Sequence, residues 1–393
     1  MSRVRERLLG MTRVREPVTR LLRRLVFSPR SPLYSRALVG LNLPRDFVED
    51  AYVYLHADVQ QSLMTGSQHF LLYGKREGRN YFQRVCDVPI LMNPLSGVNL
   101  NRYQAENLLP SDASPLSHYL LAGQPRGPWT VEKIAKQESA TAEGLPHSVI
   151  HFHCFHVDLL DEFLAAANAV ISLPTNELVV TFSDHNAGKY IKARASQTGT
   201  DFRAVEVPNR GRNFGALREL IYSTDFKHVD LWGHFHSKSS PHLDSSFTER
   251  WRTFIYSSLL DSGPDRIGYQ DILLQLTKDP KLSIAFPDDP HEFGWGENYK
   301  MGAAIGKEMG FGVSPAAPKF PVGGMFVAKR ALLEGLYEGA SRFTAGADEP
   351  LAQDGTVWHA FERLLGVVPE HLGMRAAVNR GQAGQYFWLR DTH

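Results

Sequence analysis

The second half of the sequence predicts an α/β fold, a Rossmann-type and mostly parallel β-sheet with helices on both faces, preceded by a small helical module. Three observations lead to this prediction. From residue 148 onwards, short runs of β-branched and aromatic residues alternate with segments of helical periodicity. The spacing of these runs is that of strand–helix–strand units. Glycine, asparagine and charged residues gather where the runs end, as they do in loops.

The composition is that of a globular protein with balanced charge. Of the 393 residues, 43% are hydrophobic and 22% are charged, which excludes a disordered chain, a collagen-like repeat and a disulfide-stapled miniprotein. Lys and Arg number 43 against 42 Asp and Glu, so no nucleic-acid partner is expected. No run approaches the roughly 18 apolar residues of a membrane span. The only cysteines are Cys86 and Cys154, which favours a reducing, cytoplasmic location.

Residues 1–30 depart from this balance, with nine arginines against two glutamates and with leucines interspersed. One interpretation is a basic amphipathic segment that rests on anionic lipid heads at the inner face of the membrane, or on a polysaccharide-assembly protein. The other is a solvated basic tail. A secretory signal is not expected, because Arg23 and Arg24 interrupt the apolar stretch.

Residues 31–123 predict a compact helical module with a weak internal repeat. The run His69 to Gly74 returns 49 residues later as His118 to Gly123, and each copy is expected to end a helix at its glycine. Residues 124–147 have little apolar periodicity and predict a linker with a short helix. Residues 148–393 are expected to form the main domain.

Within the main domain, strands and helices are predicted in alternation. The predicted strands cover 148–155, 177–182, 203–207, 228–235, 284–287 and 320–327, and the predicted helices cover 158–169 and 214–222, with further helices opening at Glu249 and at Asp354-Gly355. In parallel sheets, ligands bind beyond the carboxyl ends of the strands. This rule selects the loops that start near His153, Ser183, Pro208 and His234.

The loop after the third strand contains Asn209, Arg210, Gly211 and Arg212. Its glycine lets the backbone approach a ligand, and its arginines are fork-shaped donors that suit phosphate. Asn213 is expected to cap the helix that follows, which would expose N–H groups to an anion. The loop therefore predicts phosphate recognition, and the alternative is a polar loop whose arginines pair with carboxylates.

The fourth strand leads into His234, His236 and Lys238, with both histidines on one face of the extended chain. Two histidines at this spacing are a known metal pair, but spacing identifies no third ligand. Lys238 opposes a neighbouring metal unless a phosphate lies between them. We therefore expect His236 and Lys238 to contact a diphosphate.

Three later segments have both a structural and a functional interpretation. Trp251 and Arg252 could be a core residue and an ion-pair partner, or could contact substrate. The glycine-rich loop 293–298 suits a sugar ring, and the paired Gly323 and Gly324 before Met325 suit close packing or a ligand wall. Asp354 is either a helix cap or a catalytic base, with His359 and Glu362 following one turn apart.

Four ordered segments resemble the rhamnan synthesis protein F family of glycosyltransferase-like proteins. They are His151-Phe152-His153-Cys154-Phe155; Pro208-Asn209-Arg210-Gly211-Arg212-Asn213; His234-Phe235-His236-Ser237-Lys238-Ser239 with Trp251-Arg252; and Gly323-Gly324-Met325-Phe326 with Asp354-Gly355-Thr356 and His359-Ala360-Phe361-Glu362-Arg363. They span about 148–370. The stretch that begins at His69 is similar to a helical module often attached to bacterial glycosyltransferases.

The resemblance implies a GT-A-like sheet and the transfer of a sugar, L-rhamnose from a dTDP donor, to a glycan or lipid-linked glycan acceptor. The product would be a cell-surface polysaccharide such as the O-antigen of lipopolysaccharide. The sequence departs from the family pattern at Asn213, where an aspartate is frequent. It also lacks the Asp-x-Asp metal motif of many GT-A enzymes where the fourth strand ends. Donor binding is therefore either metal-independent or uses Mg²⁺ or Mn²⁺ through other residues.

The mechanism expected from the sequence places a nucleotide-sugar across the strand ends, with Asp354 as the base of an inverting transfer. His153 and Asn209 would hold the nucleoside, while Arg210, Arg212, His236 and Lys238 neutralise the diphosphate. The remaining residues expected to line the substrate site are His151, Gly211, Arg252, Gly323, Gly324, Met325 and His359. Two rival interpretations are a metallohydrolase using His151, His153, His234 and His236, and a non-catalytic carbohydrate-binding scaffold protein.

Overall fold

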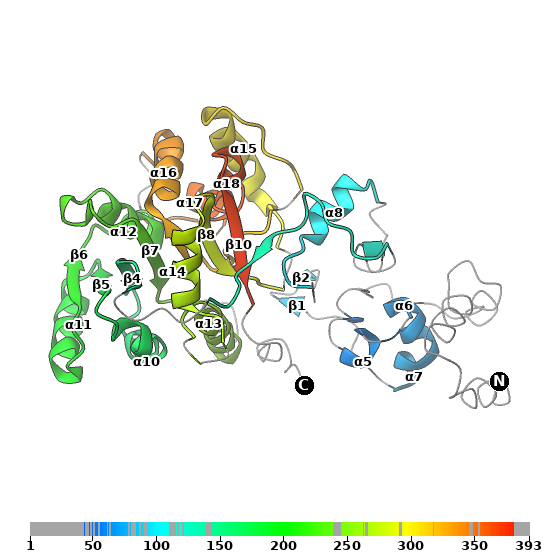
Figure 1. Ribbon diagram of the computed structural model, residues 1–393, viewed down its shortest axis with the longest axis horizontal. Coiled ribbons are helices and arrows are strands. Elements are labelled where there is room, and N and C mark those ends of the chain that lie inside the picture. The colour runs from blue at the N-terminus through cyan, green and yellow to red at the C-terminus, as the bar shows by residue number, and fades with distance from the viewer. Residues whose placement is uncertain are drawn as a thin grey trace. The chain divides into compact units, whose positions relative to one another are not determined.

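A computed structural model shows two compact units (Figure 1). The smaller unit comprises 1–94 and 110–125, and the larger comprises 95–109 and 126–393. The larger unit thus begins before the expected boundary at 148 and includes part of the expected helical module. The residues described are 43, 47, 49, 52–53, 56–60, 62, 64–77, 79, 84–85, 88–89, 93, 95–109, 115, 118–119, 122–137, 144–238, 245–261, 263, 266–290, 293–316, 318–345, 349–352 and 354–380. The basic segment 1–30 and Cys86 lie outside them.

The described residues of the smaller unit form short α-helices, a π-helical turn and a two-stranded antiparallel sheet. Its elements are α5 (Ala57–Gln60), α6 (Gly66–His69), η1 (Phe70–Gly74), α7 (Lys75–Glu77), β1 (Arg84–Val85) and β2 (Val88–Pro89). The expected helix stop at Gly74 is wrong, because helical structure continues through this residue into α7. A Cβ atom at Gly74 would lie 2.0 Å from Tyr52 Oη, so this glycine serves close packing.

The larger unit is built on an eight-stranded sheet with the order β3-β10-β8-β9-β7-β4-β5-β6. Its strands are β3 (Glu132–Lys133), β4 (Ser148–His153), β5 (Asn176–Phe182), β6 (Arg203–Glu206), β7 (Leu231–His236), β8 (Leu282–Pro287), β9 (Phe326–Lys329) and β10 (Arg375–Asn379). Neighbours are parallel except that β9 is antiparallel to β7 and β8. The predicted mostly parallel sheet is confirmed, but the segment expected to be a linker contributes strand β3.

The order of the strands reverses direction beside β4. From β4 the chain moves outward through β5 and β6, and it then returns to β7 on the other side of β4. Such a topological switch point leaves a crevice at the carboxyl ends of the two inner strands, where α/β proteins bind their ligands. In this chain the switch point lies between β4 and β7, whose carboxyl ends are at His153 and His236.

Helices cover both faces of the sheet, as predicted (Figure 1). They are α8 (Leu100–Glu106), α10 (Leu160–Ile171), α11 (His185–Thr198), α12 (Arg212–Ile221), α13 (Ser245–Leu259), α14 (Tyr269–Lys278), α15 (Tyr299–Glu308), α16 (Arg330–Thr344), α17 (Val357–Leu364) and α18 (Val368–His371), with 3-10 turns η3 (Val157–Leu159), η4 (Thr224–Phe226) and η5 (Gly296–Asn298). On one face, Phe163 of α10 stacks on Phe152 of β4 with ring centroids 4.1 Å apart.

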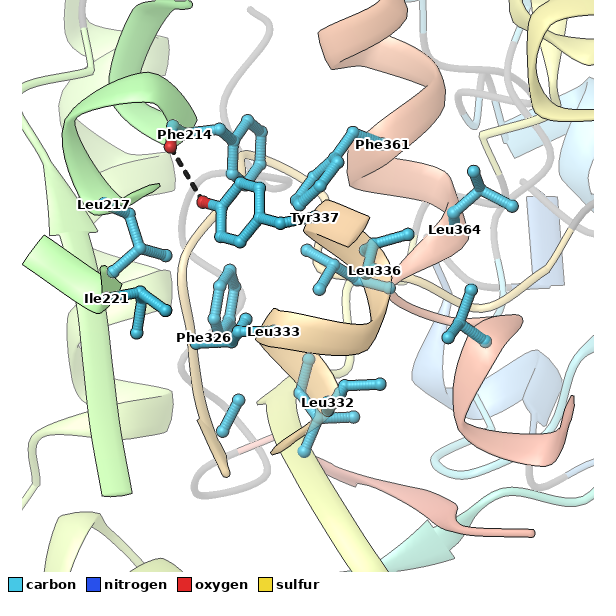
Figure 2. Packing of buried hydrophobic residues seen from close by; sticks show 14 of the residues in the cluster. Phe214, Leu217, Ile221, Phe326, Leu332, Leu333, Leu336, Tyr337, Phe361 and Leu364 are labelled. Atoms are coloured by element: carbon cyan, nitrogen blue, oxygen red, sulfur yellow. Dashed lines mark hydrogen bonds between the residues drawn. The ribbon is translucent and has the colours of Figure 1, made fainter. Parts of the chain in front are cut away.

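On the other face, α12, α16 and α17 share one buried core (Figure 2). Leu217 and Ile221 recur at helical spacing on α12, and they meet Leu333 of α16 and Phe361 of α17 in the same cluster. The Tyr337 hydroxyl on α16 donates a hydrogen bond of 2.7 Å to the carbonyl oxygen of Phe214. This core sets the positions of the starts of α12 and α17, where the predicted site residues lie.

Arg330 at the start of α16 joins the loops on this face through its buried guanidinium. Nε donates to Val229 O at 3.1 Å, Nη2 donates to Phe226 O at 2.7 Å, and Nη1 donates to Ile221 O and to Glu334. These bonds tie carbonyl groups at the end of α12 and around η4 to the start of α16.

We expect Arg330→Met to lower the free energy of unfolding by about 3 kcal/mol, because it removes three hydrogen bonds to carbonyl groups, at about 1 kcal/mol each. Urea unfolding followed by circular dichroism measures the change. The matched control is Arg342→Met on the same helix, whose exposed side chain has a 3.4 Å contact with Glu308 and whose loss should cost less than about 0.5 kcal/mol. Equal losses in the two variants would contradict this account of Arg330.

Candidate active site

The loop before β9 lies at the edge of the sheet where β7 ends, because β9 runs antiparallel to β7. His236 Nε2 lies 2.8 Å from the carbonyl oxygen of Gly323, and this ring nitrogen is the donor. Lys238 follows β7, and its Cε lies 3.6 Å from the point where a Cβ of Gly323 would stand. Three sequence-predicted residues from distant segments are thus brought together at the topological switch point.

The paired glycines are required by backbone conformation. Gly323 and Gly324 have φ angles of +91° and +70°, which favour glycine, and a Cβ at Gly324 would lie 3.1 Å from Asn213 Nδ2. The N–H of Gly323 donates to Glu362 Oε1 at 3.0 Å, which ties this loop to α17. Burial raises the pKa of Glu362, although the charges of Arg363 and Lys238 oppose that shift.

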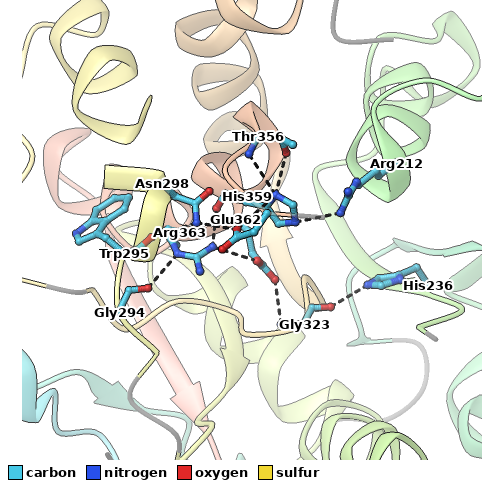
Figure 3. Close-up of polar contacts among 11 residues, drawn as sticks. Arg212, His236, Gly294, Trp295, Asn298, Gly323, Thr356, His359, Glu362 and Arg363 are labelled. Atoms are coloured by element: carbon cyan, nitrogen blue, oxygen red, sulfur yellow. Dashed lines mark hydrogen bonds and ion pairs between the residues drawn. The ribbon is translucent and has the colours of Figure 1, made fainter. Parts of the chain in front are cut away.

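Arg212 occupies a strained backbone position at the start of α12. Its φ is +54°, an unusual value for a residue with a Cβ, and it follows Gly211 at +76°. Its backbone N–H donates to Glu349 at 3.2 Å, and its Nη1 lies 3.0 Å from His359 Nε2 (Figure 3). The conformation thereby turns a guanidinium toward α17.

The partners of His359 fix its protonation. Because a guanidinium can only donate, Nε2 of His359 accepts from Arg212 and carries no proton. Nδ1 lies 2.9 Å from Thr356 Oγ1. Burial, and then the nearby charge of Arg212, lowers the pKa of His359 to about 4. His359 is therefore neutral at pH 7.

Asp354 lies beside His359, with Oδ1 3.7 Å from its Nδ1. The same oxygen accepts a hydrogen bond of 2.9 Å from Asn298 Nδ2. Partial burial alone would raise the pKa of Asp354, but hydrogen bonds from Asn298 and from the backbone of Gly355 lower it.

The expectation that α17 opens at Asp354 and Gly355 is wrong, because Thr356 is its N-cap and forms a capping box with His359. Asp354 is thus free of a capping role.

Lys238 is packed beneath an aromatic ring and supported through its backbone. Its Nζ lies 4.4 Å from the centre of the Trp251 ring. Burial lowers the pKa of Lys238, and the carboxylates of Glu362 and Asp289 act in the opposite direction. The Arg252 guanidinium, paired with Glu162 at 2.7 and 2.8 Å, donates to the carbonyl oxygen of Lys238 at 3.0 Å. Arg252 therefore supports Lys238 from within the protein.

The histidines on β4 and β7 form a chain of hydrogen bonds inside the sheet. His151 Nδ1 lies 3.0 Å from His234 Nδ1, and Thr181 Oγ1 lies 2.8 Å from His151 Nε2 and 3.0 Å from His153 Nδ1.

The expected helix cap at Asn213 is wrong. The N-cap of α12 is Gly211, and Asn213 Nδ2 lies 3.2 Å from His234 Nε2.

These residues do not fit a divalent metal. The imidazole nitrogens face one another and Thr181 instead of a common point, and Asp288 at the end of β8 is neutralised by Lys319 at 2.7 Å and Arg380 at 3.2 Å. Across the described part of the chain, no group of three or more His, Cys, Asp or Glu side chains is placed to hold a metal ion. The arrangement gives no support to the metallohydrolase interpretation.

The structure groups half of the predicted site residues and places several others elsewhere. Arg212, His236, Lys238, Gly323, Gly324, Asp354 and His359 are linked by the contacts above. His151 and Met325 are buried within the protein, His153 is almost fully buried, and Asn209 and Arg210 are exposed on the loop before α12. Sequence reasoning missed the contacts of Asn298 and Glu349. Asn298 lies in the glycine-rich loop that was expected to hold a sugar, whereas Glu349 has no local signal.

The model of the family described as rhamnan synthesis protein F matches residues 115–374, more than half of the chain. The chain belongs to this family. The matched part of this rhamnan synthesis protein F chain includes Arg212, Lys238 and Asp354. Two curated relatives from Xanthomonas campestris pv. campestris, each described as uncharacterized protein WxcX, are 25% identical over 236 residues. The match covers 59% of this chain and 33% of each relative, so the chain spans about a third of their length.

Among solved structures, the chain is similar to a mannosyltransferase from Pyrobaculum calidifontis in complex with GDP-Man and Mn²⁺. The identity is 14%, the TM-score is 0.36, and the match covers 71% of this chain and 68% of the other. It is also similar to glucosyl-3-phosphoglycerate synthase from Mycobacterium tuberculosis in complex with UDP. There the identity is 16%, the TM-score is 0.29, and the shares covered are 55% and 76%. Within the described residues, no helix is both long and apolar enough to cross a membrane.

We expect the free energy of unfolding to fall as the pH drops below about 6.5. Burial lowers the pKa of His153 to about 4 and that of His236 to about 3, and it holds those of His151 and His234 well below the usual value. The unfolded chain therefore binds more protons between pH 6.5 and 4, at about 1.4 kcal/mol per histidine per pH unit. The stabilisation is complete above pH 6.5 and is lost on acidification. Urea unfolding at pH 7.5, 6 and 5 measures it, and an unchanged midpoint would contradict the buried, neutral histidines.

Proposed function

We propose that the chain is a glycosyltransferase of polysaccharide synthesis that moves a sugar from a nucleotide-sugar donor to a glycan acceptor. One observation carries the proposal, the convergence of Arg212, Lys238 and Asp354 from three distant segments on the strand ends at the topological switch point. Two cations beside a carboxylate suit a reaction in which a diphosphate leaves and a hydroxyl loses a proton. Membership of the rhamnan synthesis protein F family supports the same class of reaction.

In the proposed reaction, Arg212 and Lys238 stabilise the donor diphosphate as it departs. Arg212 is held by His359, and Lys238 is held by Trp251 and by the Arg252 contact to its backbone, so both cations are positioned in advance. The pKa of His236, lowered first by burial and then by Lys238, is about 3, so this ring is neutral and positions Gly323. The exposed Asn209 and Arg210 are proposed to reach the nucleoside and the outer phosphate.

Asp354 is proposed as the base. Asn298 donates to Oδ1, and Oδ2 is proposed to accept the proton. The backbone of Gly296 lies beside Oδ2, where a Cβ would be in ordinary contact at 3.8 Å. The acceptor hydroxyl oxygen forms a bond to the anomeric carbon, the bond from that carbon to the diphosphate oxygen breaks, and the diphosphate leaves with the electron pair. A single displacement with one base inverts the anomeric configuration.

The finer parts of the proposal rest on the family. The donor proposed is dTDP-L-rhamnose, and the acceptor is a growing cell-surface polysaccharide. The proposed reaction involves no metal ion, because the described His, Cys, Asp and Glu side chains at the strand ends are not placed to hold one. Peripheral contact with the inner membrane is proposed through residues 1–30.

Replacing Asp354 by Asn should reduce sugar transfer by at least a hundredfold, because the amide cannot accept the acceptor proton. The donor should still raise the apparent melting temperature, because the cations remain. Transfer of labelled sugar and a thermal-shift assay measure the two effects. Asp201→Asn, an exposed aspartate just before β6, is the matched control and should transfer at the wild-type rate. Full transfer by D354N would remove Asp354 from the role.

Replacing Lys238 by Met should weaken both donor binding and transfer, about tenfold or more each, because a partly buried cation facing the diphosphate is lost. Titration calorimetry with the nucleotide-sugar and steady-state kinetics provide the two measurements. Lys189→Met on the exposed face of α11 is the control. Glycan binding without any nucleotide binding by the wild type would instead favour the carbohydrate-binding scaffold interpretation.

A further inference from the structure

The larger unit holds a cavity of about 320 Å³ on the sheet face covered by α17 and α18, apart from the Asp354 cluster. This volume is at the lower end of the range of small-molecule sites, roughly 300–1,000 Å³. Phe286 of β8 and Val367, which follows α17, provide apolar wall, and Arg102 and Glu370 provide polar groups. The cavity is lined entirely by residues of one compact unit.

The chemistry of the lining suits a sugar. Phe311 is stacked on His371 with ring centroids 4.1 Å apart, which fixes an aromatic surface at the cavity. Arg102 Nη1 lies 3.2 Å from Glu370 Oε2, so a donor and an acceptor stand side by side. Sugar hydroxyls both donate and accept hydrogen bonds, and the C–H faces of sugar rings pack on aromatic surfaces. An anionic ligand is disfavoured, because the cavity cations Lys319 and Arg102 are already paired with carboxylates, Asp288 at 2.7 Å and Glu370 at 3.2 Å.

Two segments connect the cavity to the proposed catalytic site. α17 presents His359 and Glu362 at the site, and the chain just beyond it presents Gly366 and Val367 at the cavity. From His359 to Leu364 the helix rises about 7 Å. The second segment reaches from Lys319 at the cavity to Gly323 at the site, and it packs so closely that a Cβ of Gly366 would stand 1.8 Å from Lys319 O. An extended ligand with one end at Asp354 could therefore reach the cavity.

We infer that this cavity is a distal acceptor subsite, which binds a sugar of the acceptor glycan behind the residue whose hydroxyl reacts. The inference rests on the proposed function, and it names the acceptor as an oligosaccharide longer than one sugar. A longer acceptor then gains affinity from the second contact, because the translational and rotational freedom lost on binding is lost only once for both subsites.

Gly312 gives a means to fill the cavity without disturbing the fold. It lines the cavity, a Cβ added there meets nothing within 4 Å, and its φ lies outside the left-handed region. The test variant is Gly312→Trp. The matched control is Ala193→Trp, which puts the same side chain on the exposed face of α11, beside β5 and β6 at the other edge of the sheet. Arg102→Met is a second variant that keeps the apolar stem and removes the hydrogen-bond donors.

The experiment is calorimetric titration of the full chain, without donor, with a rhamnan tetrasaccharide and with methyl rhamnoside. We expect the wild type and A193W to bind the tetrasaccharide at least tenfold more tightly than the monosaccharide. G312W and R102M should lose most of that difference. Equal tetrasaccharide affinity in G312W and A193W, or no preference for the tetrasaccharide in the wild type, would overturn the inference. The proposed function fails separately, through sugar transfer by D354N, because this titration involves no turnover.

Discussion

The direction of β9 is the constraint on which the candidate site depends. Because this strand is antiparallel to both neighbours, the loop that precedes it lies beside the end of β7. Gly323 in that loop accepts a hydrogen bond from His236 through its carbonyl oxygen and donates one to Glu362 through its N–H. One residue therefore links the sheet to α17. Since α17 also carries His359, and the loop before it carries Asp354, a parallel β9 would leave the carboxylates and the cations at opposite ends of the sheet.

Burial controls the charge of this site as much as the choice of residues does. The histidines on β4 and β7 and His359 on α17 all lie where desolvation disfavours the imidazolium form. Neutral rings can accept from Arg212 or donate to Gly323 without repelling the neighbouring cations. Arg212 and Lys238 thus remain positive charges at this edge of the sheet, and Arg363 is the cation whose charge lowers the pKa of Asp354. Because burial keeps these histidines neutral and away from a ligand, it also makes the stability of the chain fall in acid.

Local patterns predicted much of the sheet, because a strand or helix that buries one face must repeat apolar residues at its own period. The strands from β4 to β8 and helices α10, α12 and α17 were found in this way, with ends displaced by a few residues. β3 and β10 were missed. β3 has only two residues and β10 carries little alternation, so each is a strand only because a neighbour offers it hydrogen bonds. The roles of Gly74 and Asn213 were predicted wrongly for a related reason. A glycine that ends a helix and one that makes room for Tyr52 look alike in sequence, as do an asparagine that caps a helix and one that contacts His234.

By itself, the sequence determined the fold class, the sheet edge at which polar residues gather, and the family resemblance carried by four ordered segments. It did not determine which of those polar residues face a ligand. His151 and His153 match the family pattern as well as Lys238 does, yet both ring nitrogens of His151 and Nδ1 of His153 are engaged by His234 and Thr181. Asn298, Glu349 and Glu362 obtained their partners only when loops far apart in the chain came together. The physical reason is that periodicity records which face of an element is buried, whereas a hydrogen-bond partner depends on distances between elements, which only the packed structure sets.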